Sequence, residues 1–168
     1  MRESLGHLHY DSIPIFIFYE RTSRFTRYDI VYRVFNSLRE FYENFIAIYI
    51  IEYNRNVETI ICRHINCFKL LTSDINFLGN ALHTIFNECY ELLILEENGI
   101  YDLTEFCRKK CFLLGLHKTS DLRNIARSFS NLIKIISLGE VSYLTSQCIE
   151  IIGYVNTVLC REKEFLNR

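Results

Sequence analysis

The scarcity of chain-breaking residues constrains the fold of this sequence more than any other feature. One proline and six glycines occur in 168 residues. These two residue types mark most turns and end most helices and strands, so a chain with few of them should form long elements. We therefore predict long helices rather than many short strands.

The spacing of apolar residues points the same way. Between Tyr28 and Tyr53 the apolar side chains recur at intervals of three and four, which is the pattern of an amphipathic helix. They are Val31, Val34, Phe35, Leu38, Phe41, Phe45, Ile48 and Tyr49. A similar stripe runs through residues 141–164, and we predict a helix there as well.

Extending this reading along the chain gives an all-α fold of about seven helices. Asp102 and Glu105 have the spacing of a capping box, which starts a helix. The content of Ile and Phe in the first segment leaves a β-strand open there. The predicted helices cover residues 13–23, 28–53, 57–71, 75–95, 102–115, 120–138 and 141–164, after an irregular stretch over residues 1–11.

The predicted helix over residues 75–95 is apolar on more than one face. Phe77, Ile85, Phe86 and Ile94 lie outside its main stripe. A helix that is apolar nearly all round is buried on all sides. We expect the others to pack around it as one domain over residues 1–168, a helical bundle with a central buried helix.

Composition excludes several classes of protein. Hydrophobic residues make up 49% and charged residues 23%, and the net charge is -1. There is no basic stripe of the kind that nucleic-acid binders show, so no nucleic-acid partner is expected. The last predicted helix carries too many polar residues for an integral membrane span. No signal peptide is recognisable, so the seven cysteines are expected to be free thiols in a reducing compartment.

No catalytic or metal site stands out. Cys62, His64 and Cys67 could join Cys107 and Cys111 in a zinc site, but the first three do not share one face of the predicted helix. No histidine lies in a recognisable motif with a nucleophile, and no phosphate-binding loop is present. We predict a protein that is not an enzyme and has no catalytic residues, no metal and no cofactor.

The segment VFNSLREFYENF, residues 34–45, resembles the third homology motif of the Bcl-2 family of cell-death regulators, which includes divergent viral forms. Val34 stands at the leading Leu of that motif. Glu40 and Phe41 match an acidic-aromatic pair, and Phe45 matches an aromatic residue one turn later. Leu38 and Arg39 depart from the small residue and the Asp of a killer-type ligand, which implies a groove wall instead.

The segment DINFLGNAL resembles the first homology motif of the same family. Asn76, Phe77 and Gly79 match it if Leu78 is one extra residue, and Asn80 stands where the family has Arg. In the family this glycine lets a bound helix approach the groove floor. The resemblance covers about residues 13–136 and also implies the helical bundle.

The resemblance implies a viral inhibitor of host apoptosis that binds pro-apoptotic amphipathic helices in a hydrophobic groove. The implied partner-binding groove consists of Phe41, Phe45, Tyr49, Phe68, Asn76, Phe77, Gly79 and Asn80. The expected location is the host cytoplasm, with peripheral attachment at mitochondria left open. A homodimer is also left open.

Two alternatives remain at this point. A Bcl-2-like fold could inhibit innate immune signalling through its surface instead of a groove. Residues 95–125 also resemble the latter part of a death-effector domain, with Asp121 and Leu122 at its Arg-x-Asp-Leu motif and Thr119 in place of the Arg. That resemblance implies an adaptor or inhibitor that binds like domains through charged surfaces.

Overall fold

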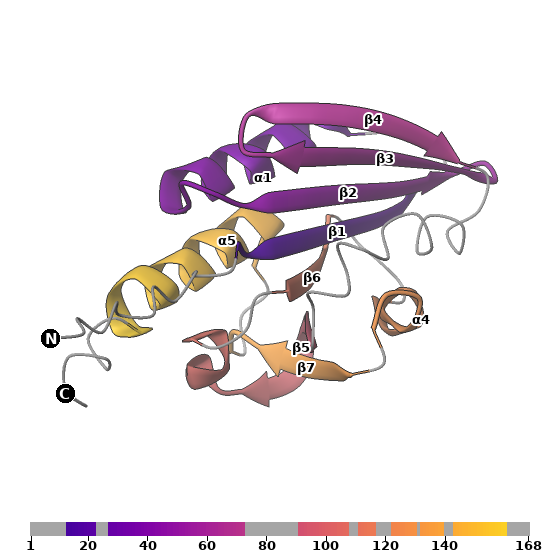
Figure 1. Cartoon of the computed structure of the whole chain (residues 1–168). Helices are drawn as coiled ribbons and strands as arrows, with labels where there is room; N and C mark the ends of the chain where they lie inside the picture. The colour runs from indigo at the N-terminus through magenta and orange to yellow at the C-terminus, as the bar shows by residue number, and fades with distance from the viewer. Residues whose placement is uncertain are drawn as a thin grey trace, which may run out of the picture.

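The protein has a mixed α/β fold built on a seven-stranded sheet with the strand order β4-β3-β2-β1-β6-β5-β7 (Figure 1). The computed structural model describes residues 13–22, 27–72, 91–107, 111–116, 122–130, 132–139 and 143–160. The strands are β1 (Ile15–Thr22), β2 (Ile46–Tyr53), β3 (Asn56–Arg63), β4 (Asn66–Thr72), β5 (Leu92–Tyr101), β6 (Cys111–Gly115) and β7 (Ile133–Ser137). The helical segments are α1 (Tyr28–Phe41), η1 (Leu103–Cys107), α4 (Leu122–Arg127), α5 (Thr145–Tyr154) and η2 (Val155–Leu159).

The sheet has a parallel part and an antiparallel part. Strands β2, β1, β6, β5 and β7 run parallel to one another. Strands β3 and β4 extend the sheet as an antiparallel hairpin beyond β2. The parallel part therefore has one edge at which the carboxyl ends of its strands meet.

Two helices lie side by side on one face of the sheet. Ser37 of α1 donates a hydrogen bond to Glu150 of α5 at 3.4 Å, and Asn156 of η2 donates to the hydroxyl of Tyr42 at 3.0 Å. Burial raises the pKa of Tyr42 to about 12.

Helix α4 packs on the opposite face, where Leu122 and Ala126 join a separate apolar cluster. None of the helices in the described part of the chain has the length and apolar character of a membrane span.

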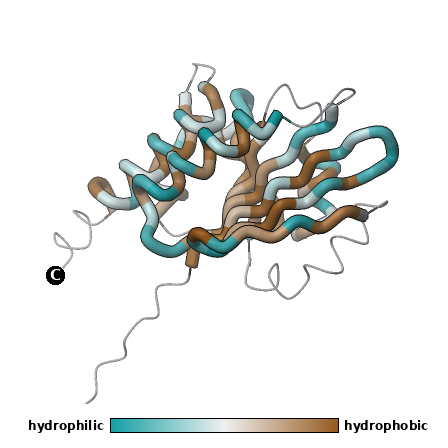
Figure 2. Tube along the Cα trace, turned by 90° about the horizontal axis from the view of Figure 1, so that it is seen from above, coloured by the Kyte–Doolittle hydropathy of each residue, from teal (hydrophilic) through white to brown (hydrophobic). Residues whose placement is uncertain are grey.

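The sequence of β1 explains why it lies at the centre. Six consecutive residues, from Ile15 to Glu20, are buried. Parallel strands covered on both faces read as continuous apolar runs rather than as an alternating pattern. Figure 2 shows the hydrophobic colour concentrated in strands at the middle of the molecule, whereas the helices alternate in colour.

The predicted all-α bundle is wrong, and the sheet shows why. Residues 13–23 contain β1, the alternative that the sequence left open. The predicted helix over 28–53 is helical only to Phe41, because Tyr42 is extended and β2 follows. An uninterrupted apolar run also satisfies a spacing of three and four, so the pattern could not separate a buried strand from a helix.

Several of the other predicted helices are also strands, in whole or in part. Residues 57–71 form the hairpin of β3 and β4, and residues 120–138 contain the short helix α4 and then β7. Asp102 does cap a helical segment, since its carboxylate accepts hydrogen bonds from the backbone N–H and hydroxyl of Thr104, but that segment is η1 and β6 follows it. The last helix is confirmed over α5 and η2. Residues 75–90 of the predicted central helix lie outside the described residues, and β5 begins at Leu92.

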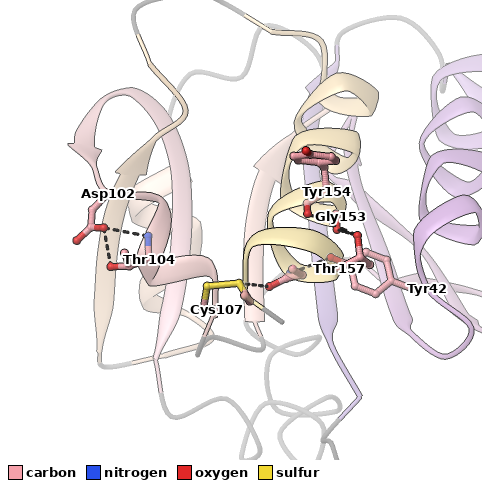
Figure 3. The surroundings of a disulfide bond; sticks show 9 residues. Tyr42, Asp102, Thr104, Cys107, Gly153, Tyr154 and Thr157 are labelled. Atoms are coloured by element: carbon pink, nitrogen blue, oxygen red, sulfur yellow. Dashed lines mark hydrogen bonds between the residues drawn. A yellow bond between two sulfur atoms is a disulfide. The ribbon is translucent and has the colours of Figure 1, made fainter. Parts of the chain in front are cut away.

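The cysteines are mostly paired instead of free. Disulfides join Cys62 to Cys67 and Cys107 to Cys160, and Cys111 is also disulfide-bonded. Figure 3 shows the Cys107 bond beside the helical turns that carry Gly153, Tyr154 and Thr157. The described residues contain no cluster of ligands that could hold a metal ion, and these bonds use the thiols of the zinc alternative. Disulfides persist in oxidising compartments, so these bonds contradict the predicted free thiols. The predicted location of the protein stays a prediction.

Candidate functional site

The strand order indicates where a ligand would bind. From β1 the chain passes through α1 to β2 on one side, whereas from β6 it passes through α4 to β7 on the other side. In open α/β sheets, ligands bind outside the carboxyl ends of the strands at such a change of direction. The candidate site therefore lies at the carboxyl ends of β1, β6, β5 and β7.

The ends of β1, β6 and α5 are tied together there. The N–H of Leu116, just after β6, donates a hydrogen bond to the carbonyl of Tyr19 at 3.0 Å. The hydroxyl of Thr145, the first residue of α5, donates to the carbonyl of Gly115 and lies 3.5 Å from that of Leu116. Because Gln147 also accepts a hydrogen bond from the N–H of Leu144 at 2.9 Å, the start of α5 is held in place.

Strands β5 and β7 contribute backbone to the same edge. A side chain at Gly99 would lie 2.3 Å from the carbonyl carbon of Ile136 and 2.6 Å from the nitrogen of Ser137, so only glycine allows this contact. After β7, the Ser137 hydroxyl donates to the Gly139 carbonyl at 2.9 Å and accepts from the Gly139 N–H at 3.0 Å. Gly139 has φ 124°, which other residues rarely adopt. These contacts join the backbones of β5 and β7 at this edge, which we call the floor of the candidate site.

One buried carboxylate stands at this edge. Glu20 is 5% exposed, and the alternation of β1 places it on the same face as Phe16 and Phe18, the face covered by α1 and α5. Its negative charge contributes to raising the pKa of Arg27, although the hydrogen bonds from Arg27 to Asp29 are the larger cause. Those bonds are 2.8 and 2.7 Å long and lower the pKa of Asp29 to about 2.

A second carboxylate lies at the end of β2 on the opposite face. The Tyr19 hydroxyl donates to Glu52 at 2.6 Å. Tyr19 belongs to the apolar cluster on the α4 side, together with Ile48 and Ile50 of β2. The two glutamates therefore serve different sides of the sheet, which makes Glu52 a useful control for Glu20.

The structure does not gather the predicted groove residues at one surface. Phe45 and Tyr49 are buried under α1 and α5, and Phe41 packs against Gly153 of α5. Phe68 is 60% exposed on β4 and pairs with Ile61, which faces the other side of the sheet. Asn76, Phe77, Gly79 and Asn80 lie outside the described residues.

Comparison with solved structures agrees with this fold. The chain resembles the crystal structure of Archaeoglobus fulgidus Nep1 bound to S-adenosylhomocysteine, with a TM-score of 0.50 and 15% identity. The match covers 81% of this chain and 72% of that chain. At this level of identity the likeness shows the fold. No protein-family model matches the chain, and a search of curated proteins gives no match.

This likeness overturns the predicted identity and function. The chain has the α/β fold of a protein that binds S-adenosylhomocysteine, not a Bcl-2 bundle, so the apoptosis inhibitor and both of its alternatives are wrong. The prediction that the chain is not an enzyme is contradicted by the same finding.

Three residues at the ends of apolar runs mark the candidate site in the sequence. Gly115 ends one predicted helix and Gly139 follows another, but in the structure Gly115 is the last residue of β6 and Gly139 lies two residues after β7. Glu20 is the charged residue that ends the apolar run IFIFYE. A charged residue or a glycine directly after a run of buried strand residues marks the carboxyl edge of a parallel sheet, where ligands bind.

Proposed function

We propose that this protein binds S-adenosylmethionine at the carboxyl ends of β5, β6 and β7 and catalyses transfer of its methyl group. The observation that carries the proposal is the fold shared with a protein bound to S-adenosylhomocysteine. That compound is what remains of S-adenosylmethionine after the methyl group has been transferred. The cofactor would supply an activated methyl group on a sulfonium.

The residues at this edge fit such a ligand. An adenosine group needs a flat space beside backbone donors and acceptors. Gly139 leaves such space, since a side chain there would have only the Tyr101 ring nearby, at 4.0 Å. Leu116 is buried and Leu138 is partly buried on the side of α1 and α5, and both supply apolar surface. Thr145 fixes the end of β6 against α5, so the segments that would bind the ligand are preorganised.

The methyl acceptor is expected not to be a polyanion. The net charge is -1. Of the 19 lysines and arginines, Arg27, Lys69, Arg123 and Lys134 form ion pairs with carboxylates. Binding to nucleic acid requires basic side chains that are available to phosphates. We retain the absence of a nucleic-acid partner as part of the proposal, and the homodimer stays an untested prediction.

Titration calorimetry of the purified chain with S-adenosylhomocysteine tests the proposal. We expect a dissociation constant of about 10 μM or tighter, near -7 kcal/mol. Gly139→Val should weaken binding at least tenfold, because it adds a side chain at φ 124° on the floor of the site. Phe68→Ala, on the exposed edge strand, is the matched control and should bind like the wild type.

Two results would count against the proposal. A chain that is folded by circular dichroism and gives no binding heat would show that the fold is shared without the ligand. Equal binding by Gly139→Val and the wild type would place the ligand elsewhere. If the chain binds the ligand, incubation with methyl-labelled S-adenosylmethionine and separate protein, RNA and small-molecule fractions identifies the acceptor class.

A further inference from the structure

Strand β4 forms one edge of the sheet and carries apolar side chains that are exposed. In the strand order it stands first, and among the described strands it pairs with β3 alone (Figure 1). Ile65, in the turn before β4, is 61% exposed, Phe68 is 60% exposed and Leu71 is 64% exposed. An exposed apolar edge strand is a template for pairing with another strand.

The backbone of β4 directs hydrogen-bonding groups outward at alternate residues. Cys62 and Cys67 lie opposite each other in β3 and β4, with their Cα atoms 4.1 Å apart. That spacing fits a pair without backbone hydrogen bonds to each other, since hydrogen-bonded pairs are about 5.5 Å apart. The N–H and C=O groups of Cys67 therefore point away from β3, and the same holds for Lys69 and Leu71. A further strand can pair with β4 through these residues.

We propose that two copies of this chain associate by pairing β4 with β4 in antiparallel orientation, with Phe68 of each copy opposite Phe68 of the other. The association does not depend on the proposed methyl transfer. A two-fold axis through this pair also sets Ile65 opposite Leu71 of the other copy. All three exposed apolar side chains then meet apolar side chains across the interface, so the edge is complementary to itself.

Charge favours this register over its neighbours. Centring the pair on Lys69 would set two ammonium groups directly opposite each other, which destabilises a sheet. Centring it on Leu70 would leave Ile65 without a partner. In the proposed register Lys69 lies opposite Cys67, and its charge is balanced by Glu58 at 3.1 Å within its own chain. Two such edges therefore meet without repulsion.

The helix α1 extends the interface on one face of the sheet. The hydroxyl of Tyr28 donates a hydrogen bond to Glu58 at 2.6 Å and accepts one from Lys69 at 3.3 Å, so this ring lies beside the hairpin. Tyr28 is 52% exposed, and Tyr32, one helical turn on, is 67% exposed.

The area of this surface indicates how strong the association is. With roughly 100 Å² from each of the five exposed side chains, two copies would bury on the order of 1,000 Å². This area is at the low end for specific interfaces, so we expect a weak dimer. The chain is then a monomer at the low concentrations of a circular dichroism experiment.

Sedimentation equilibrium of the intact chain, without ligand or reductant, tests the association. Between about 1 and 500 μM chain we expect a dimer with a Kd on the order of 100 μM. Phe68→Lys should raise the Kd about tenfold or more, because it sets two charges directly opposite each other. Leu132→Lys is the matched control, since Leu132 is 48% exposed just before β7, at the other edge of the sheet. Its Kd should stay within about twofold of the wild type.

Cross-linking tests the register. The background is Cys148→Ser, because Cys148 is the free cysteine of the described chain. With oxidised glutathione as the oxidant, Phe68→Cys should form a disulfide between two copies, since opposite residues have the Cα separation that a disulfide needs. Leu71→Cys is equally exposed, but the two copies of this residue would lie about 20 Å apart and should not cross-link.

Each outcome decides the proposal. A wild type that stays monomeric throughout the concentration range overturns it and leaves this edge to a strand of another protein. A dimer that Phe68→Lys weakens no more than Leu132→Lys also overturns it, because the interface then lies elsewhere. Cross-linking of Leu71→Cys in place of Phe68→Cys rules out the pairing of Phe68 with itself.

Discussion

The parallel strands and the β3–β4 hairpin belong to one sheet but are stabilised differently. In β1, β2 and β6 a continuous run of residues is buried, because helices or other chain segments cover both faces. In β3 buried and exposed positions mostly alternate, and β4 leaves Phe68 and Leu71 exposed at the edge of the sheet. The comparison teaches that apolar content alone does not report burial. A strand residue is buried only where another part of the chain packs on its face of the sheet.

The largest effect should come from removing an aromatic ring in the parallel part. Phe18 is fully buried and stacks on Tyr49 with ring centroids 5.0 Å apart. Phe18→Ala should lower the free energy of unfolding by about 3–5 kcal/mol, because it leaves a cavity that the sheet cannot close. Urea unfolding followed by circular dichroism measures this. A loss below about 1 kcal/mol would mean that the parallel part is not the tightly packed core.

Removing each of the two described disulfides should lower the free energy of unfolding by a different amount. Cys107 and Cys160 are separated by 53 residues, and Cys62 and Cys67 by five. In the chain-entropy description, Cys160→Ser should cost about 4 kcal/mol and Cys67→Ser about 2 kcal/mol, since the longer loop gains more freedom when it opens.

Urea unfolding without reductant compares these two variants with the wild type. Adding a dithiol reductant is the control, because it should bring all three proteins to similar stability. Equal losses in the absence of reductant would show that loop length does not set the difference. A larger loss for Cys67→Ser would reverse the comparison.

The contact between α1 and α5 should tolerate little added volume. A side chain at Gly153 would lie 2.4 Å from the Phe41 ring, at its attachment carbon, where the ring has little freedom to move away. Gly153→Ala should therefore destabilise the protein by about 1–3 kcal/mol, despite its better helix propensity. Thermal unfolding measures the loss. The double variant with Phe41→Ala tests the cause, because the two changes should be less than additive if they meet at this contact.

The smallest effect should come from the edge strand. Phe68 is 60% exposed, so Phe68→Ala should change the free energy of unfolding by no more than about 0.5 kcal/mol. The same urea experiment, run beside Phe18→Ala, gives the sharpest form of the comparison because the substitution is identical. A loss similar to that of Phe18→Ala would show that another surface covers Phe68 in solution.

Particular residues show how far the sequence could be read. Asp102 was correctly assigned as a cap, and α5 was found, because caps and single amphipathic helices are local features. The helix α1 was also found, but its continuation through Phe45 and Tyr49 was not separable from β2. The close approach predicted at Gly79 lies outside the described residues, whereas Gly99 and Gly153 make such contacts with segments distant in sequence.

The sequence by itself determined that the chain is apolar enough for a core, where α1 begins, that α5 is amphipathic, and that Asp102 starts a helical turn. Each of these follows from neighbours within a few residues. Only the tertiary structure decided that IFIFYE is a central strand, that the ends of four parallel strands and the start of α5 meet at one carboxyl edge, and that Glu20 lies buried beside it. The physical reason is that a parallel strand obtains its hydrogen bonds and its burial from segments far along the chain. Its own residues record only that they are apolar.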